Sequence, residues 1–145
     1  MADIIVTGVD GSETATRAAQ KAAEVAIAFE ASLHIVSAFG PGDQRVLTDG
    51  EGGRMVINLQ DEANRYVAET ADLVRSEFPT LKITTAVIND TPAEVLVGEA
   101  ERLDARLIVV GNKRVQGPTR ILGSVARTVA ANASCDIYVV NTRRA

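Results

Sequence analysis

The feature that most constrains the fold of this chain is an alternation of short β-rich runs with longer stretches of helical periodicity. Five runs rich in Ile, Val and Thr are bounded by Gly, Asp, Asn or Pro, which is typical of strands. They are Asp3–Val9, Ser32–Phe39, Leu81–Ile88, Arg106–Val110 and Asp136–Val140. The first, fourth and fifth are nearly continuously apolar, as parallel strands buried on both faces are.

Four helices are predicted between these runs. Glu13–Glu30 repeats apolar residues, mostly alanines, at three- and four-residue steps, which indicates one face of an amphipathic helix. A second helix is expected from about Arg54 to Phe78, and a fourth from near Ser124 to Ser134. The third begins at Thr91-Pro92-Ala93-Glu94, which combines an N-cap, a proline at the first helical position and a capping-box glutamate.

Strands joined by helices require a parallel sheet with right-handed crossovers. The sequence therefore predicts a three-layer, doubly wound α/β fold with an open sheet of five parallel strands. We expect residues 1–145 to form a single domain, because this length is typical of one domain. Residues Gly40–Gly53 contain five glycines and a proline, and they are expected to be a mobile surface loop.

Composition excludes several classes of function. With 15 Lys and Arg against 19 Asp and Glu, the net charge of −4 argues against a nucleic-acid binder. One cysteine, Cys135, and one histidine, His34, form neither an internal disulfide nor a Cys/His zinc site. No apolar run reaches the roughly 18 residues of a membrane span, and Met1-Ala2-Asp3 does not begin a signal peptide. We expect a cytoplasmic protein without a metal site.

Open parallel sheets bind ligands at the carboxyl ends of their strands, where the strand order reverses. The first strand is followed by Val9-Asp10-Gly11-Ser12, in which Gly11 permits a tight turn and Ser12 can cap the next helix. One interpretation makes Asp10 and Ser12 turn and cap residues only. The other places Asp10 against a ligand, and local chemistry leaves both open.

The segment after the fourth strand combines glycines with cations. Gly111 ends the strand, Lys113, Arg114 and Arg120 follow, and Gly123-Ser124 opens a helix. Exposed amide groups and the positive end of that helix favour an anion such as phosphate. The alternative is an ordinary glycine-rich crossover loop with solvated cations.

No catalytic residue is predicted. The P-loop, the dinucleotide-binding glycine motif and the nucleophile elbow of hydrolases are all absent from the sequence. No general base accompanies the glycine-rich loop, and His34 lies within an apolar run, where a packed histidine is expected. Cys135 has no activating histidine nearby in the sequence, so a buried structural thiol is expected there.

The sequence resembles the universal stress protein family in three stretches, which arrive in the family's order. They are Ile4–Ser12, Asn89–Glu94, and Leu107–Asn112 running into Gly123-Ser124-Val125 and then Cys135–Val140. The resemblance implies the strand order 3-2-1-4-5 and a homodimer that pairs through the fifth strand, Ile137, Tyr138, Val139 and Val140. It also implies one of two subclasses, one that binds ATP and one that lacks the site.

The ATP-binding subclass carries Gly-x-x-Gly, nine residues, then Gly-Ser or Gly-Thr. Gly111 and Gly123-Ser124 match its ends, but Arg114 replaces the second glycine, and Val115–Leu122 is eight residues long. Arg114 either carries a steric penalty where a glycine is needed or grips phosphates through its guanidinium.

The resemblance also assigns contacts along the site. It implies that Asp10, with Val9 beside it, contacts the ribose or adenine side, and that Val36 and Ala38 contact the adenine. Val110 and Gly111 would lie under the ribose and phosphates, and Gly123, Ser124 and Val125 would donate to the phosphates.

The first hypothesis is a stress-associated regulatory protein that binds ATP, with or without Mg²⁺, and hydrolyses it slowly or not at all. Cyclic AMP is a variant ligand within this hypothesis. The alternative is a dimeric universal stress protein that has lost nucleotide binding and acts through protein partners. A nucleotidyl transferase is disfavoured, because Asp10-Gly11-Ser12 is too short for such an enzyme's phosphate motif.

Overall fold

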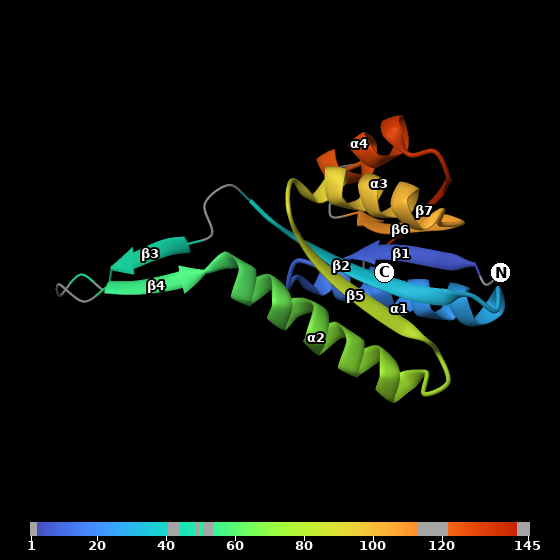
Figure 1. Ribbon diagram of the computed structural model, residues 1–145, viewed down its shortest axis with the longest axis horizontal. Coiled ribbons are helices and arrows are strands. Elements are labelled where there is room, and N and C mark those ends of the chain that lie inside the picture. Colours follow the sequence, from blue (N-terminus) through green and yellow to red (C-terminus); the bar gives the residue numbers. More distant parts are fainter. Residues whose placement is uncertain (1–2, 41–43, 49, 51–53, 113–121, 142–145) are drawn as a thin grey trace.

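A five-stranded parallel sheet lies between two helical layers in the computed structural model, which describes residues 3–40, 44–48, 50, 54–112 and 122–141 (Figure 1). The strands are β1 (Ile4–Gly8), β2 (Ser32–Phe39), β5 (Ile83–Asn89), β6 (Leu107–Asn112) and β7 (Asp136–Asn141). Their spatial order is β5-β2-β1-β6-β7. Numbered by sequence within this sheet, the order is 3-2-1-4-5, so the predicted fold class and strand order are confirmed.

Each face of the sheet has its own apolar core and its own pair of helices. On one face, α1 (Glu13–Ala28) and α2 (Leu59–Glu77) cover a cluster that includes Ile5, Leu33 and Ile35. On the other, α3 (Pro92–Leu103) and α4 (Ser124–Asn132) cover a cluster that includes Val6, Val36 and Ile108. Successive strand residues point to opposite faces, which divides each apolar run between the two cores.

Side-chain oxygens cap the N-termini of three of the four described helices. Ser12, Asn58 and Thr91 accept hydrogen bonds from the N–H groups of Ala15, Asp61 and Glu94 at the starts of α1, α2 and α3. Each of these helices also carries an acidic residue in its first turn, which favours the positive end of the helix. The cap predicted at Thr91 is confirmed.

The prediction of a loop over Gly40–Gly53 is wrong at Gln44–Thr48, and the predicted helix start near Arg54 is also wrong. Strands β3 (Gln44–Thr48) and β4 (Arg54–Asn58) form an antiparallel pair that extends away from the main sheet beyond the start of α2 (Figure 1). The pairing sets Val46 opposite Val56, and β-branched residues favour strands. Helix α2 begins at Leu59, and the Asn58 side chain caps its N-terminus. Residues 41–43, 49 and 51–53 lie outside the described part of the chain.

His34 is a packed core histidine, as its place in an apolar run predicts. It is 4% exposed, and its Nδ1 lies 2.7 Å from Thr84 Oγ1. Its Nε2 lies 3.0 Å from Glu99 Oε1, and Arg102 donates to both oxygens of Glu99. These bonds fasten α3 to β2. The Arg102 hydrogen bonds, with a smaller contribution from His34, lower the pKa of Glu99 to about 2, so the carboxylate accepts and His34 Nε2 donates.

Candidate functional site

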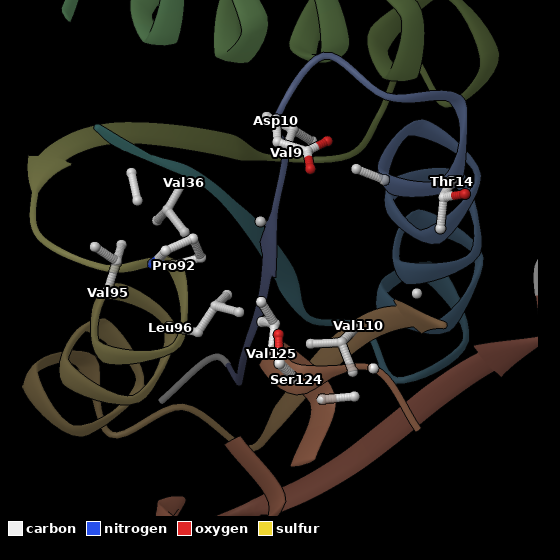
Figure 2. Close-up of a pocket in the computed structure, with 16 residues that line it drawn as sticks. Val9, Asp10, Thr14, Val36, Pro92, Val95, Leu96, Val110, Ser124 and Val125 are labelled. Atoms are coloured by element: carbon white, nitrogen blue, oxygen red, sulfur yellow. The ribbon is translucent and has the colours of Figure 1, made fainter. Parts of the chain in front are cut away.

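A pocket of about 240 Å³ opens at the carboxyl ends of β1, β2 and β6, with walls from α1, α3 and α4 (Figure 2). Within the sheet, β1 has β2 as its neighbour on one side and β6 as its neighbour on the other. This is the point of strand-order reversal at which open α/β sheets bind ligands.

Nine of the ten predicted site residues line this pocket: Val9, Asp10, Val36, Ala38, Val110, Gly111, Gly123, Ser124 and Val125. They come from three strands and the start of α4. The tenth, Arg114, lies outside the described residues.

The wall contributed by α3 was not predicted. Pro92, Val95 and Leu96 face the pocket one helical turn apart, opposite Val36 of β2 (Figure 2). The available signal was their three- and four-residue spacing just after the Thr91 cap, which marks a buried helix face. Gly8, Thr14, Ala15 and Ala126 complete the lining.

The turn after β1 is held by its own side chains and by β2. The Ser12 N–H donates to Asp10 Oδ1 at 3.0 Å, and the Ser12 hydroxyl accepts from Ala15 N–H. The Val9 N–H donates to the Val36 carbonyl at 2.8 Å, and the Ser37 hydroxyl donates to the Val9 carbonyl at 2.7 Å. Asp10 is therefore a turn residue, and it also lines the pocket.

The two glycines that match the ends of the predicted motif, Gly111 and Gly123, differ in why a glycine occupies the position. A Cβ at Gly111 would lie 2.9 Å from Thr14 Cγ2 and 3.1 Å from the Thr14 carbonyl oxygen. Packing against α1 therefore accounts for a glycine there. At Gly123 a Cβ would lie 3.8 Å from Asn112 Oδ1, and the backbone φ is an ordinary −65°. Neither its backbone conformation nor its packing against the described residues explains a glycine at position 123.

The N-terminus of α4 differs from the other helix starts. Its N-cap is Gly123, which has no side chain to cap the helix, and its first turn carries no acidic residue. The first N–H groups of a helix have no acceptor within the helix and mark its positive end. Since Ser124 and Val125 line the pocket, this end of α4 faces it.

The pocket thus has an apolar side and a side rich in amide donors. Val36, Ala38, Val95 and Leu96 form the first, and the start of α4 forms the second. Within the described residues, no group of three or more His, Cys, Asp and Glu side chains is placed to hold a metal ion. Cys135 packs under α4, outside the lining, and burial raises the pKa of its thiol.

Comparison with known proteins decides the family. The sequence model of the universal stress protein family matches residues 1–141. The chain belongs to the universal stress protein family. This membership confirms the resemblance seen in Ile4–Ser12, Asn89–Glu94 and the segments around β6 and β7. No helix in the described part of the chain has the length and apolarity that a membrane crossing needs.

Individual universal stress proteins match over nearly the whole chain. Universal stress protein Rv1636 of Mycobacterium tuberculosis is 33% identical over 150 residues, which cover 95% of each chain. Universal stress protein MJ0531 of Methanocaldococcus jannaschii is 31% identical over 137 residues, 94% of this chain and 80% of that protein. A crystal structure of a universal stress protein in complex with cAMP superposes with a TM-score of 0.75 at 28% identity, covering 98% of both chains.

Proposed function

We propose that this universal stress protein is a stress-associated regulatory protein that binds an adenine nucleotide in the pocket between β1, β6 and α4. The observation that carries the proposal is the start of α4. It is the one helix start in the described chain without a side-chain cap or a first-turn acid, and it opens onto the pocket. An anion such as phosphate satisfies the amide groups there.

Gly123 fits a phosphate contact because the described residues leave space around the position of a Cβ there. Among the described residues other than its chain neighbours, the nearest atom to a Cβ at this position would be Asn112 Oδ1 at 3.8 Å, and that oxygen accepts the Gly123 N–H at 3.1 Å. Asn112 thereby fixes the direction of the backbone that leads into α4. A side chain at position 123 would fill room that the described residues leave open.

The end of β2 fits a purine base. The Gly8–Val36 pair ends the β1 pairing, while β2 continues to Phe39. The Val36 carbonyl points towards β1 and accepts a hydrogen bond from the Val9 N–H. Because backbone direction repeats every two residues along a strand, the N–H and carbonyl of Ala38 point to the same side, beyond the end of β1. They present a donor and an acceptor beside the apolar surfaces of Val36, Val95 and Leu96. A flat base with polar edges suits such a slot.

The choice of ligand draws on the comparisons. The universal stress protein whose crystal structure contains cAMP is 28% identical to this chain and has the same fold. We propose ATP as the physiological ligand, with or without Mg²⁺, and cyclic AMP as the second candidate. Arg114, which we propose as a phosphate contact, lies outside the described residues.

Binding without efficient turnover is the proposed mode of action. Among the described lining residues Asp10 is the one carboxylate, and it already accepts from Ser12 N–H within its turn. Thr14 and Ser124 are the only hydroxyl side chains in that described lining, which contains no histidine or lysine to act as a base. We propose at most slow hydrolysis, with the bound nucleotide acting as a regulatory ligand.

A homodimer through β7 is part of the proposal. β7 is an edge strand of the sheet in the described chain, and Tyr138 on it is 41% exposed. Exposed strand edges offer unpaired backbone groups to another chain. Ile137 and Val139 pack towards the core under α4, so pairing would use the backbone of β7 and the open face that carries Tyr138.

Calorimetry of the purified protein with ATP and Mg²⁺, and separately with cyclic AMP, tests the proposal. We expect a micromolar dissociation constant, about −8 kcal/mol, for at least one of the two. Gly123→Val should weaken binding at least roughly tenfold by filling the space before α4. Gly98→Ala is the matched control, because Gly98 is an exposed glycine of α3 with no atom within 4 Å of a Cβ there.

The opposite outcome is equally clear. No heat and no thermal shift up to millimolar nucleotide would contradict nucleotide binding. It would favour the alternative function, a dimeric universal stress protein that acts through protein partners.

A further inference from the structure

One side chain from outside the pocket lies directly against the turn that carries Asp10. A Cβ at Gly11 would lie 2.7 Å from Cε1 and 2.9 Å from Cζ of Tyr66, a residue of α2. The ring is therefore packed on the backbone of the turn itself. Tyr66 is half-buried and packs against the core cluster under α1 and α2, and the Arg65 guanidinium lies 5.3 Å from its ring centroid.

The turn uses a backbone conformation that glycine adopts freely, and the lack of a side chain at Gly11 lets the Tyr66 ring reach the backbone. Gly11 has a φ of +84°, a region that residues with a Cβ rarely adopt. The Asp10 side chain and the backbone move as one unit, because Asp10 Oδ1 accepts the Ser12 N–H and Ser12 caps α1. A ring pressed on Gly11 therefore also fixes where the Asp10 carboxylate stands.

We propose that Tyr66 is a positioning residue for ligand binding. Its ring packs against the turn formed by Asp10, Gly11 and Ser12, and thereby holds the Asp10 carboxylate at the rim of the pocket. The inference rests on the proposed nucleotide-binding function. A carboxylate accepts hydrogen bonds and donates none, so its possible partners on an adenine nucleotide are the sugar hydroxyl groups and the adenine amino group. Because the base is proposed to lie against Ala38 at the end of β2, the sugar hydroxyl groups are the partners assigned to Asp10. Tyr66 itself is not among the lining residues, so it acts on the ligand only through Asp10.

The test compares two ligands that differ only in the sugar hydroxyls, ATP and 2′,3′-dideoxy-ATP, by calorimetry. Tyr66→Leu should weaken ATP binding roughly tenfold, the scale of a weakened hydrogen bond to a charged group, and should leave dideoxy-ATP binding nearly unchanged. Tyr66→Phe keeps the ring and should bind both ligands as the unmodified chain does. Asp10→Asn should reproduce the Tyr66→Leu pattern, and combining the two should add no further loss.

A ligand-free readout accompanies the calorimetry. The Gly11 NMR signals should show a ring-current shift that Tyr66→Phe retains and Tyr66→Leu removes. Tyr66→Met serves in place of the leucine variant should the latter not fold by circular dichroism, since it also lacks a ring.

The outcomes separate this inference from the proposed function. Equal weakening of ATP and dideoxy-ATP by the ring-less variant would make Tyr66 a general structural residue and overturn the inference, while nucleotide binding stands. Unchanged ATP affinity in that variant would overturn it too. Failure of the unmodified chain to bind either ligand would overturn the proposed function and this inference together.

Discussion

Replacing Glu99 with glutamine should change how the stability of the protein depends on pH. Glu99 is 6% exposed, and the groups that face it in the described structure are His34 and Arg102. The hydrogen bonds from Arg102 are the main cause of its low pKa, which falls from an ordinary 4.5 to about 2. Glu99→Gln keeps the shape of the side chain and removes the titration.

The magnitude follows from the two pKa values. A shift of 2.5 units at 1.36 kcal/mol per unit gives about 3 kcal/mol of stabilisation for the ionised carboxylate. Because the folded pKa is the lower one, this stabilisation is complete above pH 4.5 and is lost as the pH falls towards 2. At pH 3 about 2 kcal/mol of it should be gone.

Urea unfolding at pH 5 and pH 3, followed by circular dichroism at fixed protein concentration, measures the effect. The free energy of unfolding of the unmodified protein, minus that of Glu99→Gln, should fall by about 2 kcal/mol between them. Glu101→Gln, at an exposed position of the same helix, is the control. A difference that stays constant would refute the assigned role of Arg102 and His34.

Two further predictions concern packing and assembly. Gly111→Ala should destabilise the fold by about 1–3 kcal/mol through overpacking against Thr14, and Thr14→Ser should restore part of the loss in thermal unfolding by removing the Cγ2 contact. For the dimer, light scattering should give about twice the chain mass of 15.3 kDa. Successive strand residues direct their N–H groups to opposite sides. Tyr138 and Val139 are neighbours, so the N–H of one of them points away from the sheet, towards a partner chain. Proline at that position removes this N–H, and we expect that variant to be a folded monomer. Dimers in every folded proline variant would exclude β7 as the interface.

Local patterns predict the alternation of strands and helices and hence a parallel sheet, whereas the strand order and most of the pocket residues follow from the resemblance to the universal stress protein family. Apolar runs ending in Gly or Asp mark the carboxyl ends of strands, so Asp10, Gly111 and Ser124 were placed at the correct edge of the sheet. The glycine-rich stretch before α2 misled, since its composition is typical of a loop, while the β-branched residues that follow pair as β4.

The missed features depend on contacts between distant segments. Tyr66 meets Gly11 across 55 positions of sequence, and no pattern in either segment indicates the other. The same holds for Gly111, which lines the pocket and whose lack of a side chain is also required by the close approach of Thr14. Sequence motifs identify the glycine, but only packing shows which glycine the fold itself requires.

The central claim is that the start of α4 receives the phosphate of an adenine nucleotide. Backbone amide NMR signals during a titration with ATP and Mg²⁺ test it most directly. The account predicts that the amide signals of Gly123, Ser124 and Val125 move saturably, together with those of Ala38 at the base end. Saturable shifts that spare the start of α4, or none up to millimolar ATP, would contradict it.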